Sequence, residues 1–150
     1  MKEKAESLGF EAHIRTAQLQ GEAKEVARGI VEELHEAPAK SVLLYGGETT
    51  VTIEHKGKGG RNLELSLAAL QWIKEEELLF PFASDGKDNT EYAGAVCDMV
   101  TKGHAETKGL HVEEYLKKNQ SFPFFEQTED YVLTGNTGSN VSDLIIAIKV

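Results

Sequence analysis

The sequence has almost no cysteine: Cys97 is the only one in 150 residues, so an intramolecular disulfide is excluded. Met1 opens a polar segment that lacks the apolar core of a signal peptide. No run reaches the roughly 18 apolar residues that are needed to span a bilayer. These absences predict a cytoplasmic protein without a membrane segment.

Positive charge is also scarce. The chain has 16 lysines and arginines against 25 acidic residues, which gives a formal net charge of -9. This charge would repel a phosphate backbone, and no basic stripe offsets it, so general nucleic-acid binding is not expected. Hydrophobic residues at 40% and charged residues at 27% are near globular averages, which predicts one folded domain with local rather than extended anion sites.

The first third of the sequence alternates between strand and helix patterns. Apolar residues at three-and-four spacing predict an amphipathic helix over residues 22–35. A short strand is expected before it at Phe10–Ile14, and a second after it at Ser41–Tyr45. The second segment is almost continuously apolar, which is typical of a strand covered on both faces by helices, and Gly46 and Gly47 are expected to turn the chain after it.

The pattern continues with Thr49–Ile53, which is rich in β-branched residues and predicts the next strand, and with a largely buried helix from Asn62. Later segments are weaker and predict, in order, a strand at Phe80–Ala83, two helices within residues 93–118, and strands at Asp130–Leu133 and Leu144–Ile148. The short connection after Tyr45 and the final pair of strands both suggest antiparallel neighbours. We therefore expect a single α/β domain, a layered mixed β-sheet flanked by helices.

The segment from Lys56 to Arg61 has the most unusual composition, with two lysines and an arginine among three glycines just before a predicted helix. Free glycine amides and unpaired amides at a helix N-terminus suit a phosphate or a carboxylate, and Arg61 can add a forked contact. The segment matches neither the P-loop nor the dinucleotide fingerprint. A flexible, solvated connection is the alternative interpretation.

Three other polar loops follow strand ends. Gly46–Thr49 and Gly135–Asn140 each present glycine amides to a ligand or form an ordinary turn. Asp85 and Asp88, together with Glu91, are weak candidates for Mg²⁺ or a sugar-like hydroxyl, because their spacing departs from the calcium-loop pattern. The histidines show no metal-ligand spacing and no serine lies in a nucleophile elbow, which argues against zinc and hydrolase chemistry.

Several of these segments, taken in order, resemble the MOFRL domain, the C-terminal part of the glycerate 2-kinase family. The motifs are Gly46–Val51, Gly59–Leu65, Asp85–Gly86, Ala93–Ala95 and Thr134–Val141. The resemblance covers the chain from about Leu8 to Val150, and residues 1–8 would then be the end of a linking helix.

The resemblance implies transfer of the γ-phosphoryl group of ATP to the 2-hydroxyl of D-glycerate, with Mg²⁺, in a cleft between this domain and a larger N-terminal domain. That N-terminal kinase domain would be the partner of this chain, which would form one side of the cleft and be inactive alone. Arg61 aligns with the arginine of the family's Gly-Gly-Arg-Asn motif and would hold the substrate carboxylate or the transferring phosphoryl group. Leu63 stands where the family usually has glutamine, and Asn136 where it has proline.

Residues and resemblance together predict a site with Arg61 as the catalytic residue. The substrate- or phosphate-binding candidates are Gly46, Gly47, Glu48, Thr49, Gly59, Gly60, Asn62, Glu64, Asp85, Asn136, Thr137 and Asn140. Two other functions stay open: a free-standing, non-catalytic binding module for a small anionic metabolite, and a hydroxypyruvate reductase. The reductase ranks last because the sequence has no nicotinamide fingerprint.

Overall fold

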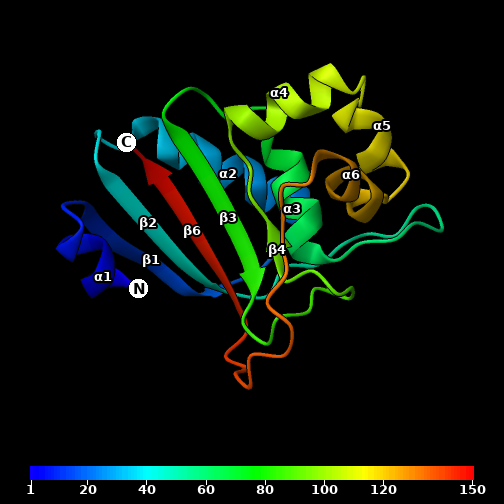
Figure 1. The fold of residues 1–150 in the computed structure, drawn as a ribbon. Helices are drawn as coiled ribbons and strands as arrows, with labels where there is room; N and C mark the ends of the chain where they lie inside the picture. The colour runs from blue at the N-terminus through cyan, green and yellow to red at the C-terminus, as the bar shows by residue number, and fades with distance from the viewer.

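The protein, described over all residues 1–150 by a computed structural model, is built on one six-stranded sheet with the order β1-β2-β6-β3-β4-β5 (Figure 1). β1 and β2 pair in parallel, and every other neighbouring pair is antiparallel. The strands are β1 (Glu11–Leu19), β2 (Ser41–Gly47), β3 (Glu77–Ala83), β4 (Gly94–Ala95), β5 (Tyr131–Val132) and β6 (Asp143–Lys149). The predicted mixed sheet is therefore confirmed.

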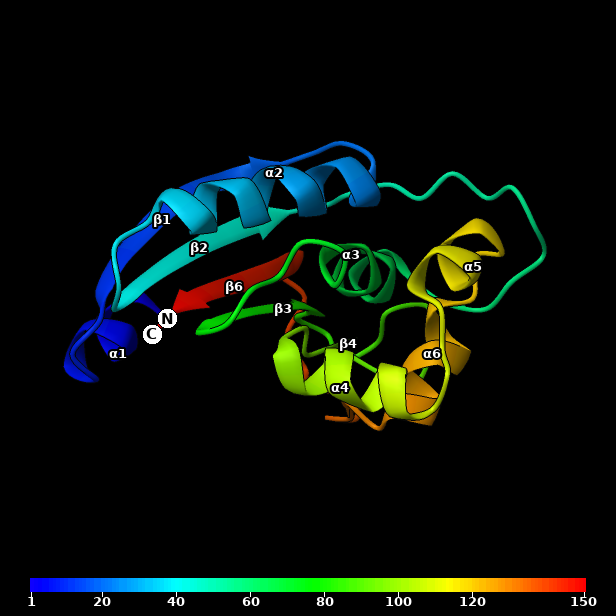
Figure 2. The ribbon, with the colours of Figure 1, turned by 90° about the horizontal axis from the view of Figure 1, so that it is seen from above.

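Six helices accompany the sheet: α1 (Lys2–Ser7), α2 (Ala23–Glu36), α3 (Arg61–Ala69), α4 (Met99–Thr107), α5 (Val112–Lys117) and α6 (Ser121–Thr128). Side chains that alternate along β2 divide the core between the two faces of the sheet. Leu43 and Tyr45 belong to the large cluster with α2 and α3, whereas Val42 and Leu44 pack in a smaller cluster with Ala5 of α1. Figure 2 shows α2 and α3 along one face of the sheet and α1 close to the two chain ends. No helix is long and apolar enough to cross a membrane.

The buried helix predicted from Asn62 is confirmed as α3, which begins one residue earlier at Arg61. Every residue from Asn62 to Ala69 is buried, because α2, the sheet and α5–α6 surround this helix. A helix enclosed in this way cannot move without disturbing the core, so its first turn is a rigid support for the loop that precedes it.

The strand predicted at Thr49–Ile53 is wrong. Only Thr50 forms an isolated bridge, to Glu22, and the Thr52 N–H donates to the Glu22 side chain at 3.0 Å instead of to a neighbouring strand. Further along the chain, Asn119 Oδ1 accepts hydrogen bonds from the N–H groups of Glu54 and His55. Side-chain oxygens thus replace a ladder partner that the sheet does not supply.

The glycine turn expected at Gly46 and Gly47 is also wrong, because β2 continues through both residues and pairs with Leu144 and Asp143 of β6. Gly47 has φ +146°, and a Cβ there would lie 2.3 Å from the backbone of Leu19. This close approach of two strands requires glycine.

Two further predictions needed correction. β5 and β6 are not neighbours, since β6 lies between β2 and β3 while β5 pairs with β4 at the sheet edge. The first strand is longer than expected and runs to Leu19.

The two helices within residues 93–118 are present as α4 and α5, but α6 was not predicted because Pro123 and three phenylalanines hide its helical pattern. Proline is tolerated there because it lies in the first helical turn.

Candidate functional site

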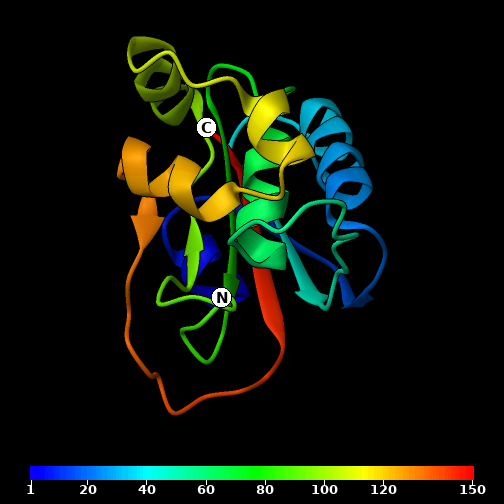
Figure 3. The ribbon, with the colours of Figure 1, turned by 90° about the vertical axis from the view of Figure 1, so that its right-hand side faces the viewer.

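The predicted loops meet at one end of the central strands. Strand pairing aligns Gly47 with Asp143 and Asp143 with Ala83, so β2 and β3 end where β6 begins. Residues 133–142 extend beyond the strands at this end, beside the loop that follows β3 (Figure 3). Groups that are far apart in the sequence therefore surround the start of α3.

Arg61, the first residue of α3, is held by two carboxylates that differ in exposure. Its Nε donates to Asp143 Oδ2 and its Nη2 donates to Asp143 Oδ1 at 3.3 Å, while Glu48 Oε1 lies 3.5 Å from Nη2. The hydrogen bond with Asp143 raises the pKa of Arg61. Asp143 is 4% exposed, whereas the Glu48 side chain is 60% exposed. Asp143 therefore fixes the guanidinium, and Glu48 is the partner that an incoming anion could replace.

The Asp88 carboxylate caps the first turn of α3 by accepting hydrogen bonds from it. Its Oδ2 accepts from the Leu63 N–H at 2.8 Å, and its Oδ1 accepts from Asn62 Nδ2 at 3.2 Å. Burial raises the pKa of Asp88 to about 6, against these hydrogen bonds. Gly60 packs directly on this carboxylate: a Cβ at Gly60 would lie 2.2 Å from the Asp88 carbonyl oxygen. The buried side chains of Asp88 and Asn62 thus bind each other and the helix.

Asp85 lies apart from this cap. Its Oδ1 accepts from the Lys87 N–H at 2.9 Å, and its carbonyl accepts from the Thr137 N–H at 3.2 Å. No group of three or more His, Cys, Asp or Glu residues is arranged to hold a metal ion. The two carboxylates named as weak metal candidates, Asp85 and Asp88, therefore serve different loops in this structure.

The loop from Gly135 to Asn140 folds against the chain after β3. The Thr137 hydroxyl donates to the Ser84 carbonyl, and Asn136 Oδ1 accepts from the Gly138 N–H at 2.9 Å. Asn140 and Asp85 share a small cavity of about 40 Å³ with Arg61. The structure therefore brings this predicted loop next to the predicted catalytic arginine.

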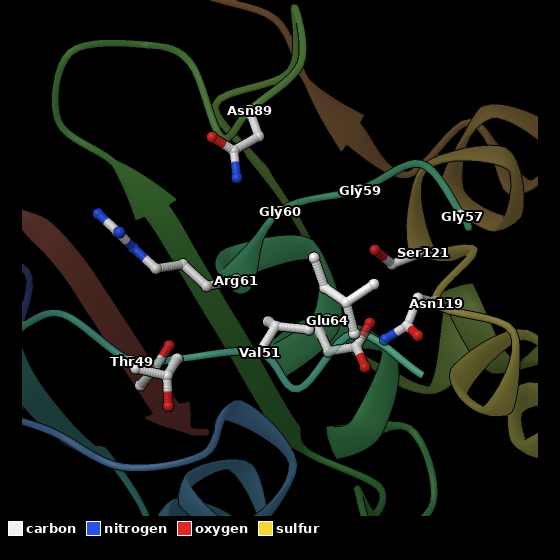
Figure 4. Close-up of a pocket in the computed structure, with 12 residues that line it drawn as sticks. Thr49, Val51, Gly57, Gly59, Gly60, Arg61, Glu64, Asn89, Asn119 and Ser121 are labelled. Carbon is white, nitrogen blue, oxygen red and sulfur yellow. The ribbon is translucent and has the colours of Figure 1, made fainter. Parts of the chain in front are cut away.

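A larger cavity, of about 340 Å³, lies on the other side of the first turn of α3. Figure 4 shows the Arg61 side chain extending away from Glu64 and Ser121, which lie together on the opposite side of Gly60. Ten of the twelve lining residues are polar, charged or glycine, and Val51 and Ile53 are hydrophobic: Thr49, Thr50, Val51, Ile53, Gly57, Gly59, Gly60, Arg61, Glu64, Asn89, Asn119 and Ser121. The predicted residues thus form two groups, one around the Arg61 guanidinium and one around this cavity.

Glu64 is the charged group of the cavity and is only 2% exposed. Its Oε1 lies 3.3 Å from Lys24 Nζ. Burial raises the pKa of Glu64, and the nearby Lys24 ammonium opposes that shift. Ser121, at the start of α6, is fully buried, and its hydroxyl has no hydrogen-bond partner.

Lys58, one of the two lysines of the glycine-rich loop, contacts α6 instead of the cavity. Lys58 Nζ lies 3.3 Å from the centre of the Phe122 ring and 3.7 Å from Glu91 Oε2. Phe122 in turn stacks on Tyr92, with ring centroids 4.5 Å apart. Lys58 therefore attaches the loop to α6 through a cation–π contact and contributes no charge to the cavity.

Sequence reasoning missed several residues of the site. Asp143 is not among the predicted site residues, although an acidic residue between a polar loop and an apolar strand is a signal for a buried ion-pair partner. Lys24 and Ser121 carry no local signal at all, because Lys24 contacts Glu64 from α2 and Ser121 lines the cavity from the start of α6.

Comparison with known proteins identifies the family. The model of the MOFRL family matches residues 41–143. The chain belongs to this family. It is 42% identical, over 96% of its length, to the glycerate 2-kinase of Pyrococcus horikoshii, and 36% identical, over 99%, to the D-glycerate 2-kinase of Thermotoga maritima. It covers 35% and 38% of those two proteins, so this MOFRL domain spans about a third of the relatives it matches.

Solved structures agree with this assignment of the MOFRL domain. The crystal structure of glycerate kinase from Thermotoga maritima matches with a TM-score of 0.94 at 36% identity, and covers 99% of this chain and 38% of that one. A crystal structure of a Pyrococcus horikoshii protein matches with a TM-score of 0.92 at 40% identity, over 99% of this chain and 36% of that one. The chain is homologous to the C-terminal part of glycerate 2-kinases.

Proposed function

We propose that this chain is the C-terminal domain of an ATP-dependent glycerate kinase, which phosphorylates the 2-hydroxyl of D-glycerate. The chain would form one side of a cleft whose other side is an N-terminal kinase domain, and it would be inactive alone. The observation that carries the proposal is the Arg61 guanidinium, fixed by buried Asp143 and otherwise contacted only by exposed Glu48.

Phosphoryl transfer depends mainly on positioning and on neutralising the charge of the transferred group. A guanidinium presents a planar fork that matches carboxylate and phosphate oxygens. An incoming oxyanion would displace Glu48 from Arg61 while Asp143 keeps the guanidinium in place. Arg61 would then hold the glycerate carboxylate or the transferring phosphoryl group.

ATP and Mg²⁺ belong to the proposal for the complete enzyme. Mg²⁺ in kinases is commonly bound by one or two carboxylates together with the phosphates. This chain has no group of three or more candidate ligands, and Asp88 is engaged with α3. The Mg²⁺ bound with the nucleotide would offset phosphate charge, and Arg61 of this chain would orient the anion.

The test is to fuse this chain to the N-terminal two thirds of the Pyrococcus horikoshii relative and to measure 2-phosphoglycerate formation from D-glycerate and Mg-ATP. We expect activity from the fusion and none from the chain alone. Arg61→Ala should lower kcat/KM about 100-fold or more, as expected for a charged group that contacts the transition state. Arg28→Ala is the matched control, because Arg28 lies on the exposed side of α2 and pairs only with Glu32.

A folded fusion that makes no 2-phosphoglycerate would contradict the proposal, as would equal activities of the Arg61 and Arg28 variants.

The second candidate function is a non-catalytic binding module for a small anionic metabolite. It is favoured by one observation, the 340 Å³ cavity that lies beside the glycine loop on this chain. Binding of small acids without any turnover in the folded fusion would support that alternative.

A further inference from the structure

Two residues that line the 340 Å³ cavity each have a buried polar atom without a hydrogen-bond partner in the chain, namely Glu64 Oε1 and the Ser121 hydroxyl oxygen. Both residues are at most 2% exposed, and Figure 4 shows them on the same side of the glycine loop. Buried polar groups are almost always hydrogen-bonded in folded proteins. Two unpartnered atoms at one cavity therefore indicate a ligand with complementary groups.

The chemistry of Glu64 specifies what that ligand must offer. The Lys24 ammonium, 3.3 Å from Oε1, compensates its charge, but it approaches outside hydrogen-bond geometry and also contacts the Leu116 carbonyl at 3.4 Å. An ionised carboxylate only accepts hydrogen bonds. The complementary group is a donor without a full positive charge, because Lys24 already balances the carboxylate, and a hydroxyl satisfies both conditions.

The glycine loop, which packs against Ser121 at one side of the cavity, suits an anion. The N–H groups of Gly59 and Gly60 donate to no backbone carbonyl, and both lie just before the nine-residue helix α3. Such amides, with the positive end of a helix behind them, favour an oxyanion. Glycine is required at both positions: a Cβ would lie 2.0 Å from the Ser121 hydroxyl oxygen at Gly59, and 2.2 Å from the Asp88 carbonyl at Gly60.

We propose that this cavity is a subsite for a small hydroxy acid, in which Glu64 accepts a hydrogen bond from a ligand hydroxyl and the Gly59 and Gly60 amides face the ligand's oxyanion. Ser121 makes a second contact with the hydroxyl-bearing end. Glu64 and Ser121 then distinguish hydroxy acids from plain carboxylic acids of the same length. The inference rests on the proposed function only in naming D-glycerate as the first ligand to test.

The first experiment titrates the isotope-labelled chain with D-glycerate and, separately, with propionate, which has the carboxylate and the carbon chain but no hydroxyl. We expect saturable amide shifts at Gly59, Gly60 and Ser121 with both acids. D-glycerate should bind about tenfold tighter or more, the preference expected for a hydrogen bond to a charged group.

Variants then locate the preference. Glu64→Gln should reduce the preference for D-glycerate over propionate to within about twofold, because the charged acceptor is lost. Ser121→Ala should weaken D-glycerate binding several-fold and leave thermal stability unchanged, because the hydroxyl has no partner to lose. Thr128→Ala is the matched control: it removes another unpartnered buried hydroxyl from α6 that does not line the cavity, so binding should not change.

Equal affinities for the two acids in the unmodified chain would overturn the assignment of Glu64, and so would a preference that survives both Glu64→Gln and Ser121→Ala. The absence of shifts at Gly59 and Gly60 with either acid would overturn the whole subsite. These outcomes are separate from failure of the kinase proposal, because the fusion could phosphorylate glycerate through Arg61 alone, and the cavity could select hydroxy acids in an inactive fusion.

Discussion

Two ion pairs lie on opposite sides of the first turn of α3, and they differ in how completely their carboxylates are satisfied. Arg61 donates to both oxygens of Asp143. Lys24 contacts only Oε1 of Glu64, and that atom accepts no hydrogen bond. Both carboxylates are nearly buried, at 4% exposure for Asp143 and 2% for Glu64, so burial alone does not explain the difference.

The contrast separates a positioning role from a binding role. A charge pair in which both carboxylate oxygens accept hydrogen bonds holds its members in one geometry, whereas a partly satisfied pair keeps free hydrogen-bonding capacity in a low-dielectric site. Arg61 thus supplies a fixed cation at the ends of β2, β6 and β3, and Glu64 supplies an available acceptor to the cavity beside the glycine loop. The turn of helix between them sets the distance between the two functions.

The largest predicted effect comes from Gly60→Ala, which would disturb both sides together. The new Cβ would lie 2.2 Å from the Asp88 carbonyl oxygen and 2.3 Å from its carboxyl carbon. We expect a loss of about 4 kcal/mol in the free energy of unfolding, from overpacking together with the weakened cap. Urea denaturation followed by circular dichroism measures this loss.

Gly29→Ala serves as the control for that substitution, because Gly29 lies within α2 and a Cβ there meets nothing within 4 Å. It should stabilise the protein by about 1 kcal/mol, the difference in helix propensity. If Gly60→Ala were as stable as the unmodified chain, the packing of the glycine loop on Asp88 would be wrong.

Sequence analysis anticipated the parts of this arrangement that depend on local pattern. The periodicity of α3 and the glycines before it were recognisable because helix spacing and glycine-rich turns are encoded within a few residues. The pairing of Arg61 with Asp143 spans 82 positions, and no local pattern encodes it. The insertion of β6 between β2 and β3 is likewise a long-range event, and it decides which loops meet Arg61.

The predictions that failed at the cavity also failed because of long-range contacts. Thr49–Ile53 has strand propensity, but its backbone is bound by side chains of Glu22 and Asn119, so tertiary contacts override the local preference. Ser121 reaches the cavity only because α6 forms, and that helix was not predicted. Site residues on unpredicted elements could not be found from the sequence.

The pH dependence of stability gives the second prediction, because Asp88 supports the turn that both pairs share. Burial raises its pKa in the folded protein to about 6, from an ordinary value of 3.8. The folded state therefore binds this proton more tightly than the unfolded chain does. The contribution of Asp88 to stability is fully present below about 3.8 and is lost as the pH rises through about 6, a change of about 3 kcal/mol.

Chemical denaturation at pH values between 4 and 7 checks this, with Asp88→Asn as the reference. Asparagine does not titrate, so the difference between the two proteins should favour the unmodified chain increasingly toward acid pH. Other carboxylates titrate in both proteins, and their effect cancels in the difference. A difference that is flat, or that grows with rising pH, would show that Asp88 is not the destabilising charge beneath α3.

The smallest predicted effect compares the two pairs directly, by replacing each cation with methionine. Arg61→Met leaves Asp143 nearly buried without either of its two arginine hydrogen bonds, and should cost about 2 kcal/mol, a value reduced because the Arg61 side chain is 36% exposed. Lys24→Met removes one contact with Glu64 and one long hydrogen bond to the Leu116 carbonyl, and Glu64 can take up a proton because burial already raises its pKa, so the cost should stay below about 1 kcal/mol at pH 6. Urea denaturation of both variants measures the two costs. Equal costs would mean that Glu64 is as fully engaged as Asp143, which would remove the physical basis for placing a ligand hydroxyl at Glu64.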